Sequence, residues 1–169
     1  MIVSNETIVK EWFHVKRSAR GSSSFDLETF LPYRLSVTTN RVSRAFAGHY
    51  EQEFGISIPE WRAIAVLGAF APLSSNAICE RTAMDKAKVS RAVATLLKRG
   101  LIEREPHETD QRLIQLTLSK AGRRIYEAII PRARAIEAEM TKGLSKADIA
   151  QLHSVLDRVA MCLDEIESD

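Results

Sequence analysis

The chain has 169 residues, a formal net charge of +2, 45% hydrophobic residues and 27% charged residues. This length fits one domain, or one domain extended by additional helices, and the composition is that of a packed globular chain rather than a disordered one. Nucleic-acid binding cannot be inferred from so small a net charge. No apolar run approaches the roughly 18 residues of a membrane span, and the N-terminus lacks the apolar core of a signal peptide. We therefore expect a cytoplasmic protein with no membrane partner.

The composition also argues against catalytic and metal chemistry. Cys79 and Cys162 form neither a metal-ligand spacing nor a disulfide framework, and the four histidines are scattered. The chain contains no Ser/His/Asp order with a nucleophile elbow, no Gly-rich phosphate loop and no paired carboxylates beside a basic group. We expect no enzyme activity, no catalytic residues, no metal and no cofactor. Oxidation of either thiol as a regulatory switch stays open as an alternative.

The first third of the chain predicts an appendage followed by two helices. Residues 1–25 indicate an N-terminal arm that contains a flexible Ser/Gly-rich stretch. Apolar residues at helical spacing then predict a long helix with Asp26 as its N-cap and Gly55 at its end. Ser57 is expected to cap a second, largely apolar helix, which ends before Pro72.

Residues 73–122 are the most informative part of the sequence. A short helix is expected over Asn76–Thr82, with Ser74 or Ser75 as its cap. A tight bend leads to a second helix over Lys86–Arg99, with Asp85 as its N-cap and Gly100 as its C-terminal stop. This order, two short helices around a tight turn, predicts a helix-turn-helix motif.

A β-hairpin and two further helices are expected to follow. Residues 101–104 and 113–118 alternate apolar and polar side chains, so each predicts a half-buried strand, with a polar turn between them. Ser119 is expected to cap a long helix interrupted near Pro131, and Ser145 to cap the last helix. The predicted fold is mainly α with a small β-hairpin wing.

The helix over Lys86–Arg99 has two distinct faces. Its apolar residues fall at i, i+3, i+4, i+7 and i+8, and they are Val89, Ala92, Val93, Leu96 and Leu97. The same segment carries five Lys or Arg residues and no Asp or Glu. A helix that enters the major groove of DNA needs a basic, polar face opposite a core face.

Individual roles follow from the chemistry of base edges and phosphates. Arg91 can donate two bonds to guanine, while Ser90 and Thr95 can contact bases beside the small residues Ala87 and Ala94. Phosphate contacts, which position the protein without specifying sequence, are expected from Lys86, Lys88, Lys98 and Arg99. Donors at the preceding helix N-terminus are Ser74, Ser75 and Asn76. At the hairpin tip, expected to enter the minor groove, the candidates are His107, Thr109, Gln111 and Arg112.

These residues carry a family resemblance. The phrase ICERTAMDKAKVSRAVATLLKRGLIER, followed by TDQR and LTLSKAG, resembles the MarR family of bacterial transcription regulators. The Asp-x-Arg pattern of the family's wing is matched by Asp110 and Arg112. The resemblance covers roughly residues 26–166. Ala83, where many members have Gly or Leu, and Ser119, in place of the usual Thr, are mild departures.

The resemblance implies a function and an assembly. It implies a winged helix-turn-helix repressor that binds double-stranded DNA as a homodimer at a pseudo-palindromic operator and is released by a small aromatic effector. Residues 57–118 would form the DNA-binding domain, and residues 26–56 and 119–169 a helical dimerisation region. Two other classes stay open, which are a module that docks another protein and a sequence-independent architectural DNA binder.

Two further strings, LPYRLSVTTNRVSRAF and FGISIPEWRAIAVLG, resemble a subgroup that controls the breakdown of lignin-derived aromatic acids. Those relatives respond to hydroxycinnamoyl-CoA thioesters such as p-coumaroyl-CoA or feruloyl-CoA. The candidate effector-binding residues are Tyr33, Arg34, Thr38, Asn40, Arg41, Trp61, Arg62 and Ala65. A free phenolic acid as effector, or thiol oxidation as the signal, is the alternative.

Overall fold

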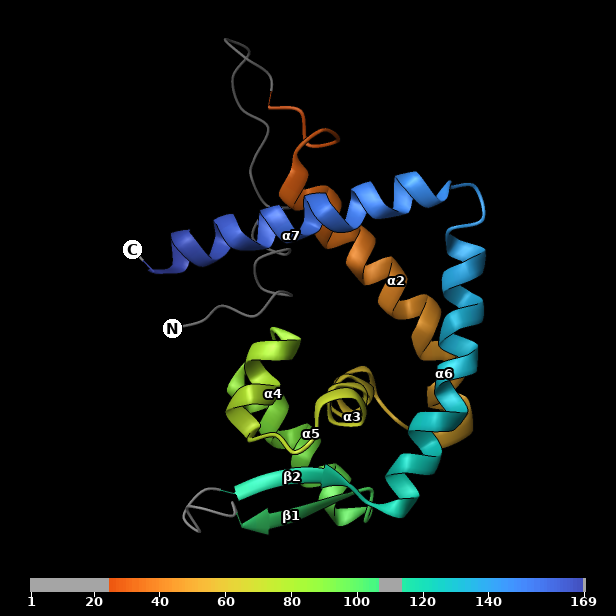
Figure 1. Cartoon of the computed structure of the whole chain (residues 1–169), viewed down its shortest axis with the longest axis vertical. Helices are drawn as coiled ribbons and strands as arrows, with labels where there is room; N and C mark the ends of the chain where they lie inside the picture. The colour runs from red at the N-terminus through yellow and green to blue at the C-terminus, as the bar shows by residue number, and fades with distance from the viewer. Residues whose placement is uncertain (1–24, 107–113, 169) are drawn as a thin grey trace, which may run out of the picture. The chain divides into compact units, whose positions relative to one another are not determined.

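The computed structural model describes residues 25–106 and 114–168 (Figure 1). Within these ranges 74% of the residues are helical, and the remaining regular structure is one antiparallel hairpin of two strands. The predicted fold class, mainly α with a β-hairpin wing, is therefore confirmed. The expectations for residues 1–24 and for the hairpin tip, 107–113, lie outside the described residues.

The chain divides into two compact units, Met1–Ile129 and Ile130–Asp169. The first contains α2 to β2 and the beginning of α6, and the second contains the rest of α6 and all of α7. All residues of the buried hydrophobic cluster belong to the first unit. No helix in the described parts of the chain is both long and apolar enough to span a membrane.

Helix α2, Leu31–Phe54, begins four residues later than the sequence suggested. Its N-cap is Phe30, and a proline occupies its first turn. Asp26 instead accepts a hydrogen bond from the Glu28 backbone N–H at 3.0 Å, within a separate turn. The prediction of Asp26 as N-cap was wrong because Pro32, which has no N–H and a fixed φ, is best placed in the first turn of a helix.

Helix α3, Ile58–Phe70, begins at the predicted cap, Ser57. The Glu60 carboxylate accepts bonds from the Ser57 backbone N–H at 2.7 Å and from its hydroxyl at 2.9 Å. This reciprocal arrangement satisfies groups that the helix start leaves without partners. Sequence reasoning named Ser57 but missed Glu60, although the S-x-x-E spacing was visible.

The helix-turn-helix consists of α4, Ser75–Thr82, and α5, Lys86–Lys98. Ser74 is the N-cap of α4, since its hydroxyl accepts the Ala77 N–H at 3.1 Å. Between the helices Ala83 adopts a left-handed conformation with φ of 50°. Glycine reaches this conformation without the crowding that a Cβ causes. This explains why many MarR-family members have glycine at this position, where the present chain has alanine.

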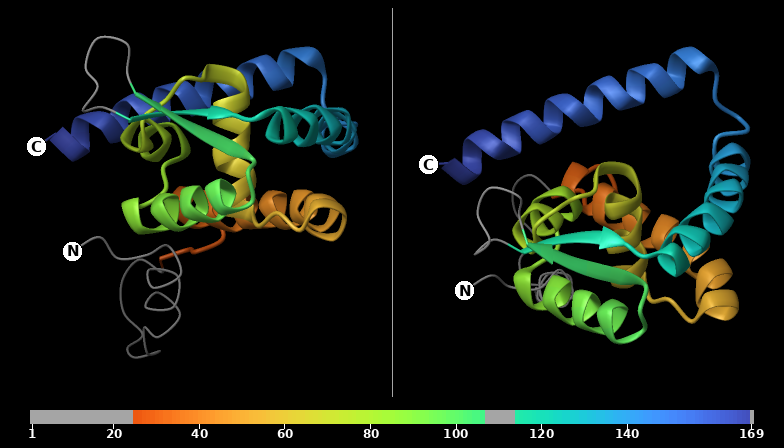
Figure 2. Two further views of the ribbon diagram at one scale, coloured as in Figure 1. Left: turned by 90° about the horizontal axis from the view of Figure 1, so that it is seen from below. Right: turned by 60° about the horizontal axis from the view of Figure 1, so that its bottom comes forward.

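The hairpin pairs β1, Ile102–Pro106, with β2, Ile114–Leu118, in antiparallel register from Ile102 opposite Leu118 to Pro106 opposite Ile114 (Figure 2). Leu73 adds an antiparallel bridge to Leu116 in β2. The Leu73 N–H donates to the Leu116 carbonyl at 3.1 Å, and the return bond is 2.8 Å. This bridge joins the segment before α4 to the base of the wing.

Two long helices complete the chain, α6, Lys120–Met140, and α7, Lys146–Ser168. The predicted caps are confirmed, because the Ser119 hydroxyl accepts the Gly122 N–H at 3.1 Å and the Ser145 hydroxyl accepts the Asp148 N–H at 3.1 Å. The predicted interruption of α6 near Pro131 was wrong. The helix continues through this proline, whose missing N–H removes one backbone bond without ending the helix.

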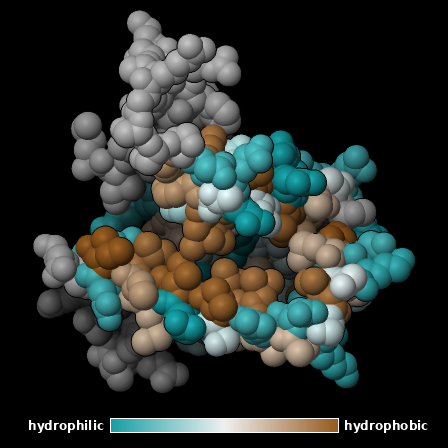
Figure 3. Space-filling view, turned by 90° about the horizontal axis from the view of Figure 1, so that it is seen from above, coloured by the Kyte–Doolittle hydropathy of each residue, from teal (hydrophilic) through white to brown (hydrophobic). Residues whose placement is uncertain are grey.

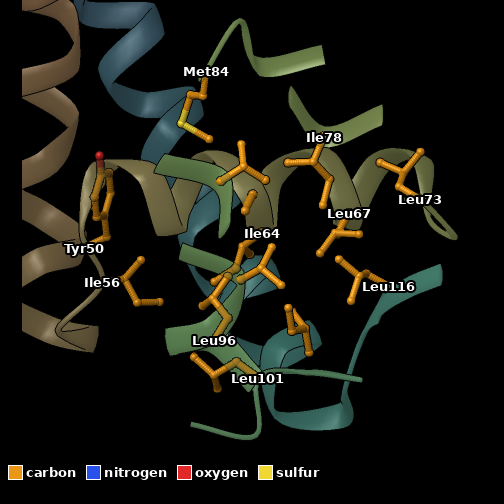
Figure 4. Packing of buried hydrophobic residues seen from close by; sticks show 14 of the residues in the cluster. Tyr50, Ile56, Ile64, Leu67, Leu73, Ile78, Met84, Leu96, Leu101 and Leu116 are labelled. Carbon is orange, nitrogen blue, oxygen red and sulfur yellow. The ribbon is translucent and has the colours of Figure 1, made fainter. Parts of the chain in front are cut away.

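A single hydrophobic cluster holds the first unit together (Figure 4). Side chains from α3, α4, α5 and the hairpin meet in it, and Ile56 adds a contact from the α2–α3 junction. Ile64, Leu67, Ile78 and Leu96 are each 0% exposed. Their burial fixes α5 against α3, so the orientation of α5 about its own axis is determined.

The start of α6 meets the end of α5 at close range. The buried Ser119 donates its hydroxyl to the Gly100 carbonyl at 2.7 Å, and its backbone N–H bonds to the Leu101 carbonyl at 3.1 Å. A Cβ added at Gly122 would overlap the Leu101 carbonyl oxygen. Only glycine at position 122 allows this approach of helix and wing.

Gly122→Ala should therefore lower the free energy of unfolding by about 2–3 kcal/mol, because backbone must move to admit the methyl group. Gly48→Ala is the matched control, since a Cβ there meets nothing within 4 Å. That change, inside α2, should stabilise by about 0.5–1 kcal/mol. Urea denaturation of both variants measures the difference, and equal effects would contradict the close approach.

Candidate nucleic-acid interface

Helix α5 has one buried apolar face and one exposed polar face, as the sequence predicted. Four residues of the apolar stripe are buried, and the fifth, Leu97, is half-buried against the cluster. The exposed residues form the opposite face, and they are Lys86, Ala87, Ser90, Arg91, Ala94, Thr95 and Lys98. The face carries three cations and no anion, and its small side chains leave room for close approach by a ligand.

Asp85 orders the N-terminus of α5. Its carboxylate accepts the Lys88 backbone N–H at 2.7 Å and lies 3.4 Å from the Lys88 ammonium. The backbone hydrogen bond from Lys88 is the main cause that holds the pKa of the Asp85 carboxyl below its usual value. Lys88 is half-buried and held by this pair, so it is less available to a phosphate than Lys86, which is exposed.

The central residues of the exposed face differ in how their polar groups are used. The Thr95 hydroxyl donates to the Arg91 carbonyl at 3.0 Å, so its oxygen can still accept a hydrogen bond. The Arg91 guanidinium is exposed and has no hydrogen-bond partner among the described residues. Arg91 therefore retains all five of its donors for a ligand.

The N-terminus of α4 presents Ser74, Ser75 and Asn76, all exposed. Ser74 uses its oxygen as an acceptor for the cap, and its O–H can still donate. The wing candidates His107, Thr109, Gln111 and Arg112 lie outside the described residues. The two strands that lead to them are described, and their bases are fixed to α5 and to Leu73.

The structure places Arg99 differently from the sequence expectation. Its guanidinium donates to the carbonyl oxygens of Gly55 at 2.9 Å and Phe54 at 2.6 Å. Arg99 thus contacts the end of α2 instead of extending from the exposed face of α5. Sequence separations of 44 and 45 residues explain why no local pattern indicated this contact.

The candidate effector residues lie on α2 and α3. Tyr33 is half-buried on α2, and the other α2 candidates, Arg34, Thr38, Asn40 and Arg41, are exposed. On α3 the half-buried candidates are Trp61, Arg62 and Ala65. The Arg62 guanidinium donates to the Ser43 hydroxyl of α2 at 3.2 Å, which links the two helices.

Trp61 belongs to an aromatic cluster. Its ring centroid is 5.7 Å from that of Tyr50 and 6.3 Å from that of Tyr126, with interplanar angles of 32° and 27°. Burial raises the pKa of Tyr50 to about 12, so its phenol is neutral at physiological pH. Trp61 is thus engaged by two protein rings, and its stacking on an effector stays a prediction.

The two thiols are unpaired, with Cys79 half-buried in α4 and Cys162 exposed in α7. Among residues 25–106 and 114–168, no three His, Cys, Asp or Glu side chains gather as a metal site would require. The helix-turn-helix, its basic exposed face and the hairpin that follows define the chain as a winged helix-turn-helix protein.

Comparisons with known proteins agree with this class. Residues 54–113 match the model of the MarR family. An uncharacterized HTH-type transcriptional regulator of Mycobacterium leprae is 27% identical over 83% of this chain and 97% of that protein. The crystal structure of a MarR/EmrR family transcriptional regulator from Acinetobacter sp. ADP1 is also 27% identical, with a TM-score of 0.78 over 83% of this chain and 99% of that one.

A further solved structure is too distant in sequence to show more than a shared fold. It is a MarR family regulator from Listeria monocytogenes complexed with a 26mer DNA, 18% identical, with a TM-score of 0.75 over 81% of this chain and 91% of that chain. Taken together, the match over residues 54–113 and these similarities support a MarR-type transcriptional regulator with a winged helix-turn-helix fold. The proteins that the chain resembles are transcriptional regulators and not enzymes, which agrees with the expectation of no enzyme activity.

The Asp85 cap makes a pH-dependent contribution to stability. Because the folded-state pKa is lowered, this contribution is fully present above the usual carboxyl value of 3.8 and is lost as the pH falls through the folded-state pKa. Asp85→Asn keeps an N-cap of similar strength without a titrating group. Below pH 4 the variant should lose less stability than the parent in thermal melts. Parallel pH profiles would contradict the assignment.

Proposed function

We propose that the chain is a homodimeric repressor that binds a pseudo-palindromic DNA operator. The proposal rests mainly on one observation: the orientation of α5 is fixed by its packing. Burial of Val89 and Leu96 leaves the basic face outward beside the base of a wing. A helix with a basic, polar face and small side chains fits the major groove. The Listeria monocytogenes neighbour, which has the same fold, was solved with DNA.

In this proposal the exposed side chains divide their roles. Arg91 reads a guanine edge, with Ser90 and Thr95 beside it. Lys86, Lys98 and the α4 N-terminus contact phosphates, and Lys88 joins them once it exchanges the Asp85 carboxylate for a phosphate. His107, Thr109, Gln111 and Arg112 complete the interface at the wing tip. Residues 57–118 thereby act as the DNA-binding domain.

Self-association is supported by the surface of α7. This helix has no buried residue, and several of its large apolar side chains are exposed. They are Leu152, Val155, Leu156, Met161, Leu163 and Ile166. Figure 3 shows apolar residues, in brown, exposed at the surface. Monomeric proteins rarely leave such a surface uncovered, so we assign residues 26–56 and 119–169 to dimerisation, with two α5 helices about 34 Å apart.

We further propose a small aromatic effector that binds between α2 and α3 and releases the DNA. The exposed Arg34 and Arg41 suit the phosphates or carboxylate of a hydroxycinnamoyl-CoA thioester, and Asn40 suits a phenol. Tyr33, Thr38, Trp61, Arg62 and Ala65 complete the candidate wall. A regulator of aromatic acid breakdown follows from this choice of ligand, with a free phenolic acid or thiol oxidation as the competing signal.

Fluorescence anisotropy with labelled DNA from just upstream of the chain's own gene tests DNA recognition. The Arg91→Ala change should cost about 1–3 kcal/mol on this DNA and little on a scrambled control. The Lys98→Ala change should weaken both equally and reduce the salt slope by about 0.9. Equal losses for Arg91→Ala on both DNAs would exclude base reading. Wild-type protein with no preference would favour an architectural binder, and no binding would favour a protein-docking module.

The same assay tests the effector when p-coumaroyl-CoA, feruloyl-CoA and the free acids are added separately. Release by a thioester alone supports the proposed ligand class. Release by a free acid selects the phenolic alternative. Release only after oxidation, abolished by serine at Cys79 or Cys162, selects the thiol alternative.

Dimerisation through α7 predicts that Leu156→Glu gives a monomer, because the added charge would be buried in the interface. Ser154→Glu, at an exposed position about 160° around the same helix from Leu156, adds the same charge and should leave the dimer intact. Sedimentation velocity at micromolar concentration separates the two species. A Leu156→Glu dimer as stable as the parent would remove α7 from the interface.

A further inference from the structure

The C-terminus of α2 is contacted by a cation from another part of the chain. The last carbonyl groups of a helix have no helical partners and form the negative end of its dipole. Gly55, with φ of 59°, donates its N–H to the Glu51 carbonyl at 3.0 Å. The last turn of α2 contains no basic residue. The Phe54 and Gly55 carbonyls instead accept hydrogen bonds from another part of the chain.

Arg99 supplies this cation from the end of α5. One guanidinium donates separate bonds to two consecutive carbonyl oxygens, those of Phe54 at 2.6 Å and Gly55 at 2.9 Å. A planar fork of donors fits two neighbouring acceptors, which a single ammonium cannot do with the same geometry. The contact joins the end of one helix to the end of another, and we call it the Arg99 clamp.

The backbone of Arg99 is itself held firmly. Arg99 is the C-cap of α5, and its N–H donates to the Thr95 carbonyl at 3.0 Å. Gly100, with φ of 65°, donates its N–H to the Leu97 carbonyl at 2.9 Å. Next to the accepting carbonyls, Ile56 is 0% exposed in the same cluster as Leu96 (Figure 4). Both ends of the clamp are thus attached to ordered structure.

We infer that Arg99 is a positioning residue for DNA recognition, through which α2 sets the orientation of α5. The inference rests on the proposed function. Arg99 in this role does not neutralise a phosphate, although its place beside Lys98 suggests that it would. A shift of the α2 terminus displaces the Phe54 and Gly55 carbonyls, and the clamp transfers the displacement to the end of α5.

A phosphate contact and a clamp respond differently to lysine. A phosphate contact needs only a positive charge, so Arg99→Lys preserves most of it. The clamp needs the fork, so Arg99→Lys removes at least one of the two carbonyl bonds. Loss of orientation affects base contacts, which require fixed geometry, more than the long and flexible contacts to phosphate.

The experiment compares full-length Arg99→Lys and Arg99→Gln with the parent and with Lys98→Gln, a matched loss of charge one position away. Anisotropy is measured on the specific and scrambled DNA over a series of salt concentrations. Hydrogen exchange of residues 51–56 is measured without DNA. For Arg99→Lys we expect specific affinity to fall about tenfold, with unchanged scrambled binding, an unchanged salt slope and faster exchange at residues 51–56. Lys98→Gln should weaken both DNAs equally.

Parental specific affinity and parental exchange in Arg99→Lys would overturn the inference. A lowered salt slope in Arg99→Gln, with equal losses on both DNAs, would do the same by identifying a phosphate contact. Failure of the proposed function is recognised separately, because it is read from the parent protein as an absence of preference for the specific DNA. That result removes the role in recognition, whereas the exchange data alone decide whether the clamp exists.

Discussion

The burial of one face of α5 is the constraint on which the remaining architecture depends. Val89 and Leu96 are almost completely inaccessible, and they pack with the α3 side chains Ile64 and Leu67. Because these contacts fix the rotation of the helix, every residue on its other face has a determined direction. The core thus does more than stabilise the fold, since it decides which side chains can reach a ligand. The caps at both ends then limit how far the helix can slide along its axis.

The interface proposed for DNA is a set of side chains on rigid supports. Asp85 orders the start of α5, and the Ser119 hydroxyl joins the Gly100 carbonyl after its end to the first turn of α6. The bridge between Leu73 and Leu116 joins the α4 segment to the wing in the same way. Each support uses backbone groups that would otherwise lack partners, so local satisfaction of hydrogen bonds and placement of the site are achieved together.

Local sequence signals predicted much of this arrangement, and their failures have common causes. The stripe of α5 and the caps at Ser57, Ser119 and Ser145 depend on periodicity and on neighbours within four residues, and the structure bears them out. Asp26 failed because a competing proline, Pro32, decided where the helix begins. The Arg99 contact, the aromatic neighbours of Trp61 and the Leu73 bridge join residues distant in sequence, and no periodicity encodes them. The roles of the site residues themselves remain proposals, because chemistry alone suggested them.

The division of the chain at Ile129 has a consequence for how such a protein can evolve. The cluster that determines the fold is complete within the first unit, and α7 contributes no buried residue to it. Substitutions on the apolar face of α7 therefore leave the buried cluster of the first unit unchanged, while those on α3 or α5 do not. Because α7 belongs to the proposed dimer interface, changes in α7 alone would be expected to weaken the affinity between two copies after gene duplication, and each copy would keep its ancestral core. The two paralogues would then stop forming mixed dimers before any change occurred in the exposed face of α5.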